Sequence, residues 1–148
     1  MDDFIKSLDE NLEYIDHEII GDYIYIKISS KQTEMCCPFC GQISKKVHST
    51  YSRRIQDLPI QGMKVILVLN NRKIFCENQE CEHVTFSERY SFLSDKSKKT
   101  KRLEDEILRI SLNMSSVAAA EALSQNMVSI GKSTICRLIK KRMPESRN

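Results

Sequence analysis

Two short segments each carry a pair of cysteines: Cys37-Pro38-Phe39-Cys40-Gly41 and Cys76-Glu77-Asn78-Gln79-Glu80-Cys81. Four soft thiolates around one centre are the tetrahedral ligand set that suits Zn²⁺. A short turn lets both sulfurs of a pair point at the same ion, and Gly41 lets the backbone curl around it with positive φ. The spacing therefore predicts one zinc ion held by Cys37, Cys40, Cys76 and Cys81 in a zinc ribbon, with β-strands between the pairs.

Other ligand sets stay open at this site. Cys36 competes with Cys37, although the regular Cys-Pro-x-Cys-Gly turn favours Cys37, and His48 and His83 are further candidates. Iron of the rubredoxin type also takes four thiolates. The four-residue spacing of the second pair disfavours iron.

The composition is that of an ordinary globular chain, with 41% hydrophobic and 29% charged residues. No apolar stretch approaches the ~20 residues that a membrane-spanning helix needs, and the acidic N-terminus does not resemble a secretory signal. We expect a cytoplasmic, nucleoid-associated protein without a membrane partner, in which thiols stay reduced. Cys136, far from the two pairs, is expected to be a small buried hydrophobe.

Charge is unevenly distributed along the chain. Residues 1–34 hold nine acids and three bases, a net charge of −6, whereas the remaining residues hold twenty bases and eleven acids, a net charge of +9. The two add to the overall charge of +3. This asymmetry favours contact between the larger part and a polyanion.

The first half of the chain has mostly strand periodicity. Residues 2–12 are compatible with a short helix, and residues 14–19 and 23–28 flank Gly21-Asp22 as a β-hairpin would. Residues 63–69 and 73–75 flank Asn70-Asn71, which predicts two strands joined by a tight turn.

Helical periodicity begins after residue 94. Leu103, Ile107, Ile110 and Met114 fall on one helical face. Residues 115–123 offer an N-cap followed by strong helix formers, and a third helix is predicted from about residue 132 to 142, before Pro144. Three short helices with a basic third one are typical of a helix-turn-helix. A generic three-helix unit with a solvated basic face is the alternative.

The expected DNA contacts are hydroxyls and cations on the outer face of the third helix and in two basic stretches. Short hydroxyls and Arg suit base edges and phosphates, and Lys suits phosphates. These residues are Lys132, Ser133, Thr134, Arg137, Lys140 and Lys141 on the helix, Arg53 and Arg54 on the ribbon, and Lys98, Lys99, Lys101 and Arg102 before and at the start of the first helix.

The predicted fold class is α+β, with a β-rich zinc ribbon followed by a small three-helix domain. The expected divisions are 1–34 for an N-terminal helix and hairpin that act as scaffold, 35–93 for the zinc ribbon, and 94–148 for the helix-turn-helix.

An ordered set of motifs resembles the N-terminal part of the ISL-type insertion-sequence transposases. Across residues 14–142 it comprises segment 37–41, segments 48–54 and 57–62, segment 72–76 with Cys81, segments 86–89 and 99–103, and the helical segment 133–138. The resemblance implies a zinc ribbon and a helix-turn-helix that recognise the terminal inverted repeats of the element. In that family a catalytic domain with three metal-binding carboxylates follows. No catalytic residue is expected here, because the chain ends at Asn148 and no spacing of its acids suggests a two-metal site.

The leading hypothesis is therefore sequence-specific binding of double-stranded DNA at transposon ends, by a chain that is not itself an enzyme. A homodimer is left open. A zinc-ribbon module that contacts a protein, a freestanding DNA-binding regulator and a redox protein with four cysteines are the alternatives.

Overall fold

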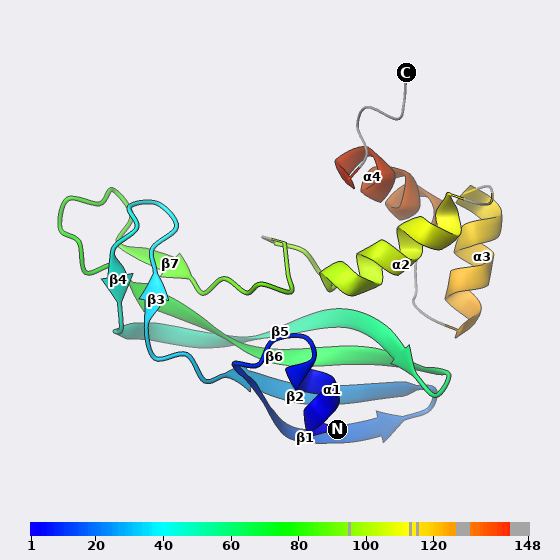
Figure 1. Cartoon of the computed structure of the whole chain (residues 1–148), viewed down its shortest axis with the longest axis horizontal. Helices are drawn as coiled ribbons and strands as arrows, with labels where there is room; N and C mark the ends of the chain where they lie inside the picture. Colours follow the sequence, from blue (N-terminus) through cyan, green and yellow to red (C-terminus); the bar gives the residue numbers. More distant parts are fainter. Residues whose placement is uncertain (95, 113, 115, 127–130, 143–148) are drawn as a thin grey trace.

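The computed structural model describes residues 1–94, 96–112, 114, 116–126 and 131–142. A long twisted sheet carries a small cysteine-rich unit at one end and three helices near the other (Figure 1). The first half contains α1 (Asp2–Lys6), β1 (Leu12–Ile20), β2 (Tyr23–Ser30), β3 (Met35–Cys36), β4 (Ile43–Ser44) and β5 (Val47–Ile60). The second half contains β6 (Met63–Phe75), β7 (Thr85–Ser87), α2 (Lys101–Ser111), α3 (Ser116–Asn126) and α4 (Lys132–Arg142).

The long hairpin of β5 and β6 is the frame of the molecule. Its two strands pair antiparallel from Val47↔Ile74 to Ile60↔Met63. Gln61 and Gly62 close it with φ values of 48° and 79°. Two consecutive residues with positive φ are what a type I′ hairpin turn requires, and its twist matches that of the strands.

The predicted N-terminal hairpin is confirmed, and it joins this frame. β1 pairs antiparallel with β2 around Gly21, whose φ is 60°. β2 then pairs in parallel with β6, which gives the strand order β1-β2-β6-β5, with β7 added to the far end of β6. The scaffold expected at 1–34 therefore shares one sheet with strands of the segment 35–93.

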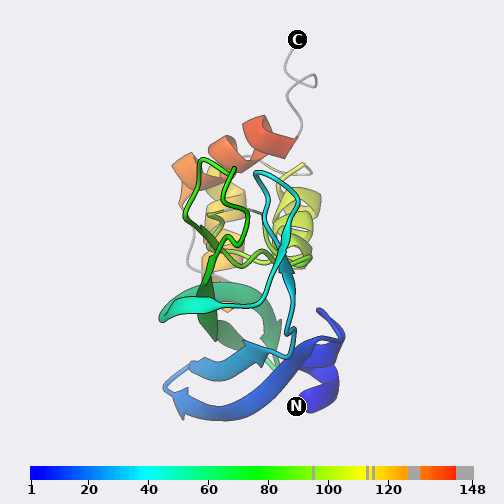
Figure 2. The same ribbon diagram turned by 90° about the vertical axis from the view of Figure 1, so that its left-hand side faces the viewer.

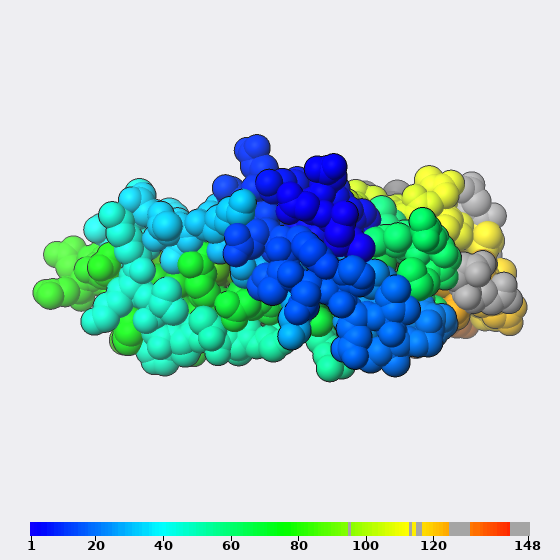
Figure 3. Space-filling model, turned by 90° about the horizontal axis from the view of Figure 1, so that it is seen from below, coloured from blue at the N-terminus to red at the C-terminus, as the bar shows by residue number. Residues whose placement is uncertain are grey.

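One face of the sheet is buried and holds the main core. Buried residues of β2, β5 and β6 meet residues of α1 and of the segment after β7 there. Figure 2 shows α1 beside β1 at the edge of the curved sheet. The buried members are Ile5, Leu12, Ile24, Ile26, Ile28, Ile55, Val65, Leu67, Leu69, Tyr90, Phe92 and Leu93. The space-filling view in Figure 3 places the N-terminal helix and hairpin across the middle of the molecule, with the cysteine-rich unit and the helices at its two ends.

Three sequence-based predictions of local structure are wrong. Met114 does not continue the apolar face of α2, because α2 ends at Ser111 and Met114 is 41% exposed. Asn70-Asn71 is not a turn, because β6 runs unbroken through it against Tyr51 and Ser52 of β5. The fully buried Asn71 accepts a hydrogen bond from Arg53 and donates one to the Arg72 carbonyl, so its amide is satisfied within the strand. The N-terminal helix is shorter than 2–12 and ends at Lys6, since Leu12 begins β1.

Helices α2, α3 and α4 enclose a second core. Its buried residues are Leu103, Ile107, Leu108, Ala119, Leu123, Ile135 and Leu138. Thr100 caps α2, since its hydroxyl accepts a hydrogen bond from the Leu103 amide. The third helix has the predicted bounds. The second extends to Asn126, three residues beyond the predicted 115–123. Residues 127–130, Ser115 and Pro144 lie outside the described part.

No helix in the described part of the chain is long and apolar enough to cross a membrane.

Candidate metal centre and nucleic-acid interface

The four predicted ligands meet at one point. The Sγ atoms of Cys37, Cys40, Cys76 and Cys81 all lie within 4.8 Å of one another. Cys37 Sγ is 4.0 Å from Cys81 Sγ, and Cys40 Sγ is 3.6 Å from Cys76 Sγ. Tetrahedral zinc with Zn–S bonds of ~2.3 Å requires S···S distances of ~3.8 Å. The four thiols therefore have the chemistry and the spacing of a structural zinc site.

Backbone hydrogen bonds fix the turn that carries the first pair. The two-stranded β3–β4 sheet brings Cys37 to the turn, where its amide bonds to the Gln42 carbonyl at 2.9 Å. The Gly41 amide returns to the Cys37 carbonyl at 2.9 Å, and Gly41 has φ 80°. A side chain at this φ would be strained, so glycine suits the place where the chain curls behind the thiols.

The second pair is held at the end of the long hairpin. Cys76 directly follows β6, and its amide bonds to the Val84 carbonyl at 2.9 Å. The Cys81 amide bonds to the Asn78 carbonyl at 3.1 Å, while the His83 amide points at Cys81 Sγ at 3.5 Å. An N–H directed at a ligand sulfur favours the thiolate, as does a metal.

The core beneath these turns is small. It consists of Met35, Cys37, Ile74 and Phe86, with Cys76 and Cys81 packed against it. So few apolar side chains bury little surface, and small domains of this kind depend on a metal or a disulfide for stability.

The alternative ligands lie outside the cluster. Cys36 Sγ donates to the Gly41 carbonyl at 3.3 Å. His83 stacks on Phe39 with ring centroids 3.5 Å apart, and His48 packs edge-on against Phe75. The geometry thus favours Cys37 over the three residues that the sequence left open.

Cys40 and Cys76 differ in how readily they ionise. Hydrogen bonds from the Gln42 backbone and the Asn78 side chain lower the pKa of Cys40 to about 6. At Cys76 the Asn78 backbone lowers the pKa, but burial and the neighbouring thiols outweigh it and raise the pKa to about 12. A divalent cation would neutralise the charge that opposes ionisation of the second thiol.

Helix α4 presents a basic face to solvent. Ile135 and Leu138 are buried against the other helices, whereas Lys132, Ser133 and Arg137 are exposed. The exposed residues border a shallow depression together with Cys136 and Lys140. Cys136 is only half-buried, so it is not the fully buried small hydrophobe expected from the sequence.

A cleft separates α4 from the connector before α2. Arg137 and Thr134 line one side, and Lys98 and Lys99 line the other. Burial lowers the pKa of Lys99, Glu104 opposes this, and the charges of Lys98 and Arg137 add smaller downward shifts. Cations outnumber the acid Glu104 in the lining, so the cleft carries net positive charge, which favours a polyanion.

The buried Glu104 anchors the end of α4 to α2. Its carboxylate accepts from Arg142 Nη1 at 3.1 Å and lies 3.5 Å from Lys141 Nζ. Arg142 also pairs with Asp105. Lys141, expected to contact DNA, therefore pairs with Glu104 although its side chain stays 47% exposed, and Arg142, which was not among the expected contacts, shares the same carboxylate. The sequence offered one signal for these ion pairs: Glu104, next to Leu103, is an acid on the inward face of α2.

Arg102, another expected DNA contact, has a structural partner. It donates from Nε to Asp57 Oδ1 at 2.9 Å and from Nη2 to Oδ2, and its guanidinium lies over the Phe4 ring. Lys101, beside it, is exposed. Arg102 thus joins α1, β5 and α2, and Lys101 keeps an accessible charge at the start of α2.

The two arginines expected on the ribbon lie on β5 and point to opposite faces of the sheet. Arg53 donates to the Ser97 carbonyl at 2.6 Å and to Asn71, whereas Arg54 lies over the Tyr25 ring. Both are at mid-sheet and do not adjoin the cysteine cluster.

Four thiols at the ends of a β3–β4 turn and a second loop define the class of this region as a zinc ribbon. Residues 33–81 match the zinc-finger of transposase IS204/IS1001/IS1096/IS1165. The chain is also similar to the transposase for insertion sequence element IS1001 of Bordetella parapertussis, with 34% identity over 76 residues. The resemblance to the N-terminal portion of ISL-type transposases is thereby confirmed. No solved structure matches the chain.

The similarity to the IS1001 transposase is partial. It covers 49% of this chain and 18% of that transposase. The chain therefore spans less than a fifth of the relative that it matches.

Proposed function

We propose that this chain is the end-binding part of an insertion-sequence transposase, which binds double-stranded DNA at the terminal inverted repeats of its element. The observation that carries the proposal is the match of residues 33–81 to a transposase zinc-finger, followed along the chain by a helix with an exposed basic face. Zinc held by Cys37, Cys40, Cys76 and Cys81 would stabilise the ribbon. Helix α4 would contact the bases and recognise the DNA sequence.

The arrangement of α2, α3 and α4 supports a helix-turn-helix. Ala119 of α3 is fully buried in the core that also contains Ile135 of α4. Its small side chain permits the two helices to pack closely. The N-terminal half of α4 carries Lys132, Ser133 and Arg137 on its exposed side. In helix-turn-helix proteins this part of the recognition helix lies in the major groove and contacts base edges.

Arg137 is the residue expected to read a base. It is exposed and borders both depressions along α4, and the described residues offer it no ion pair. Replacement by Ala should leave folding intact, weaken binding by roughly 1–3 kcal/mol and relax discrimination at one position. The measurement is selection of bound sequences from random duplex DNA with zinc-loaded protein, followed by titration of the selected site.

Lys140 provides the matched control on the same helix. It is exposed near Arg137 and suits a phosphate contact. Lys140→Ala should weaken binding to all duplexes alike and reduce the slope of log affinity against log salt by about one. If Arg137→Ala binds the selected site as tightly as the parent, the assignment of α4 as the recognition helix is wrong.

A second candidate function, contact with another protein, is supported by the tip of the ribbon. Phe39, Ile43 and Val84 are 52%, 54% and 73% exposed there, and apolar side chains gathered on one exposed surface favour contact with a protein. If the partner is a second copy of this chain, Val84→Ser should reduce self-association in sedimentation velocity and leave the affinity for a single DNA site unchanged.

A further inference from the structure

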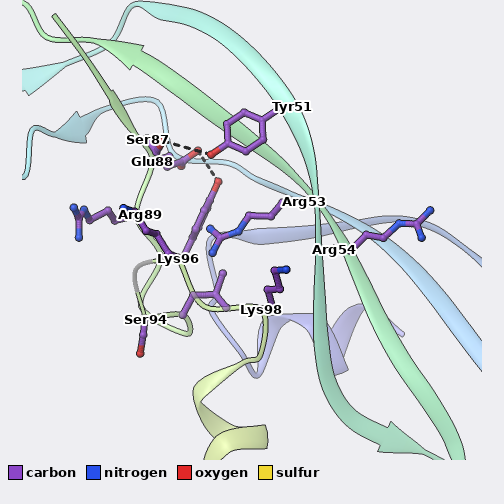
Figure 4. A pocket seen from close by; sticks show the side chains of 11 residues that line it. Tyr51, Arg53, Arg54, Ser87, Glu88, Arg89, Ser94, Lys96 and Lys98 are labelled. Atoms are coloured by element: carbon purple, nitrogen blue, oxygen red, sulfur yellow. Dashed lines mark hydrogen bonds between the residues drawn. The ribbon is translucent and has the colours of Figure 1, made fainter. Parts of the chain in front are cut away.

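A groove on the edge of β5 forms a further basic surface away from α4. It encloses about 620 Å³ between Tyr51 and Arg53 of β5 and the segment that follows β7. Figure 4 shows Arg53 and Lys98 on the same side of β5, Arg89 extending from the segment opposite, and Arg54 pointing away across the strand. Lys96 also lines the groove.

The acid in the lining does not cancel this positive charge. Glu88 is almost fully buried and receives two hydrogen bonds from Arg72, each 2.8 Å long, and a third from Tyr90. Its charge is thus balanced behind the groove wall. Arg53 instead donates to two neutral oxygens, those of the Ser97 carbonyl and the Asn71 amide, so its positive charge remains available to the groove.

The groove continues into the cleft beside α4. Lys96 and Lys98 line both, and the cleft ends at Arg137. A row of cations therefore leads from the proposed recognition helix across the connector to the middle of the sheet. Such a row follows the path of a phosphate backbone better than the shape of a small ligand.

We propose that this groove holds backbone phosphates of the same DNA duplex that α4 contacts, on one flank of the recognised sequence. The inference rests on the proposed function and extends it. Cations and hydroxyls are the donors that proteins use for phosphate oxygens, and the groove adds the hydroxyls of Tyr51 and Ser87 to its cations. Contacts of this kind add affinity that depends on salt and not on sequence.

Arg89 tests the groove separately from the cleft. It is exposed, and it lines the groove but not the cleft beside α4. The selected site is embedded in a short duplex that covers only that site and in duplexes extended on the left flank, the right flank or both. Affinity is measured from 50 to 200 mM salt for the parent, Arg89→Ala and the charge-keeping Arg89→Lys.

Loss of one phosphate contact reduces the salt slope by about 0.9, which removes roughly a threefold change in affinity over this range. We expect this loss for Arg89→Ala on duplexes extended along one particular flank, no difference from the parent on the short duplex, and recovery in Arg89→Lys. The control Lys27→Ala removes an exposed cation of β2 that borders Asp16 and Glu18 elsewhere on the sheet, and it should match the parent throughout.

Two results separate the two proposals. If the parent gains affinity on a longer flank but Arg89→Ala gains just as much, the groove assignment is overturned while DNA binding stands. If the parent shows no salt-dependent affinity for any duplex, the proposed function itself fails.

Discussion

Cys76→Ser is expected to lose zinc and unfold the ribbon. The purified parent should contain about one zinc per chain, and the variant should fall below ~0.1, because structural zinc sites contribute about 10–16 kcal/mol in small zinc-finger domains. The core under the site is too small to replace that contribution. Elemental analysis together with far-UV circular dichroism measures both effects, and the helical signal should survive because the helices have a separate core.

The chain offers two cysteines as matched controls. Cys36 is adjacent to a proposed ligand but bonds to the Gly41 carbonyl, and Cys136 lies in α4. Replacing either with Ser should leave the zinc content at that of the parent. A Cys76→Ser protein that retains zinc, or a metal-free parent with an intact ribbon, would contradict the assignment of the four ligands.

Asp57→Ala is expected to destabilise the junction between sheet and helices. Asp57 is fully buried, accepts from Thr100 Oγ1 at 2.7 Å and holds the guanidinium of Arg102. Removing the carboxylate leaves a partly buried cation without its partner, which costs about 3–5 kcal/mol. In a chain of this size the midpoint of thermal unfolding should fall by on the order of 10 °C.

An exposed ion pair supplies the comparison. Glu106 and Arg109 are paired on the outer face of α2, where solvent weakens the attraction. Glu106→Ala should change stability by less than about 1 kcal/mol. Equal losses of thermal stability in the two variants would show that the Asp57 pair does not anchor α2.

The parts that the sequence predicted well are those with local signals. The two cysteine pairs are local units, each spaced within six residues, and the hairpin around Gly21 follows from alternation and a turn residue. The third helix was bounded well because its apolar period is unbroken. The order of these parts along the chain is the order that the resemblance to transposases implies.

The parts that it missed depend on partners distant in the chain. Asn70-Asn71 has the composition of a turn. Only the pairing of β5 with β6 on both sides of it shows that the strand continues. The pairing of Arg102 with Asp57, which is 45 residues earlier, has no local signal in the sequence. Lys141 and Arg142 meet Glu104 only after the three helices pack. Periodicity carries no information about such pairings.

The long hairpin of β5 and β6 also limits how the chain can change in length. The 14 residues of β5, whose register against β6 shifts between Val47 and Ser49 and between Asp57 and Ile60, span up to ~46 Å at ~3.3 Å per residue, more than the ~34 Å of one DNA turn. Deleting one residue from each strand would turn the following side chains to the opposite face of the sheet, whereas deleting two would keep every side chain on its own face. The length of the hairpin can thus change in two-residue steps of ~7 Å without moving side chains to the other face. Variation in its length should therefore occur in paired steps on both strands.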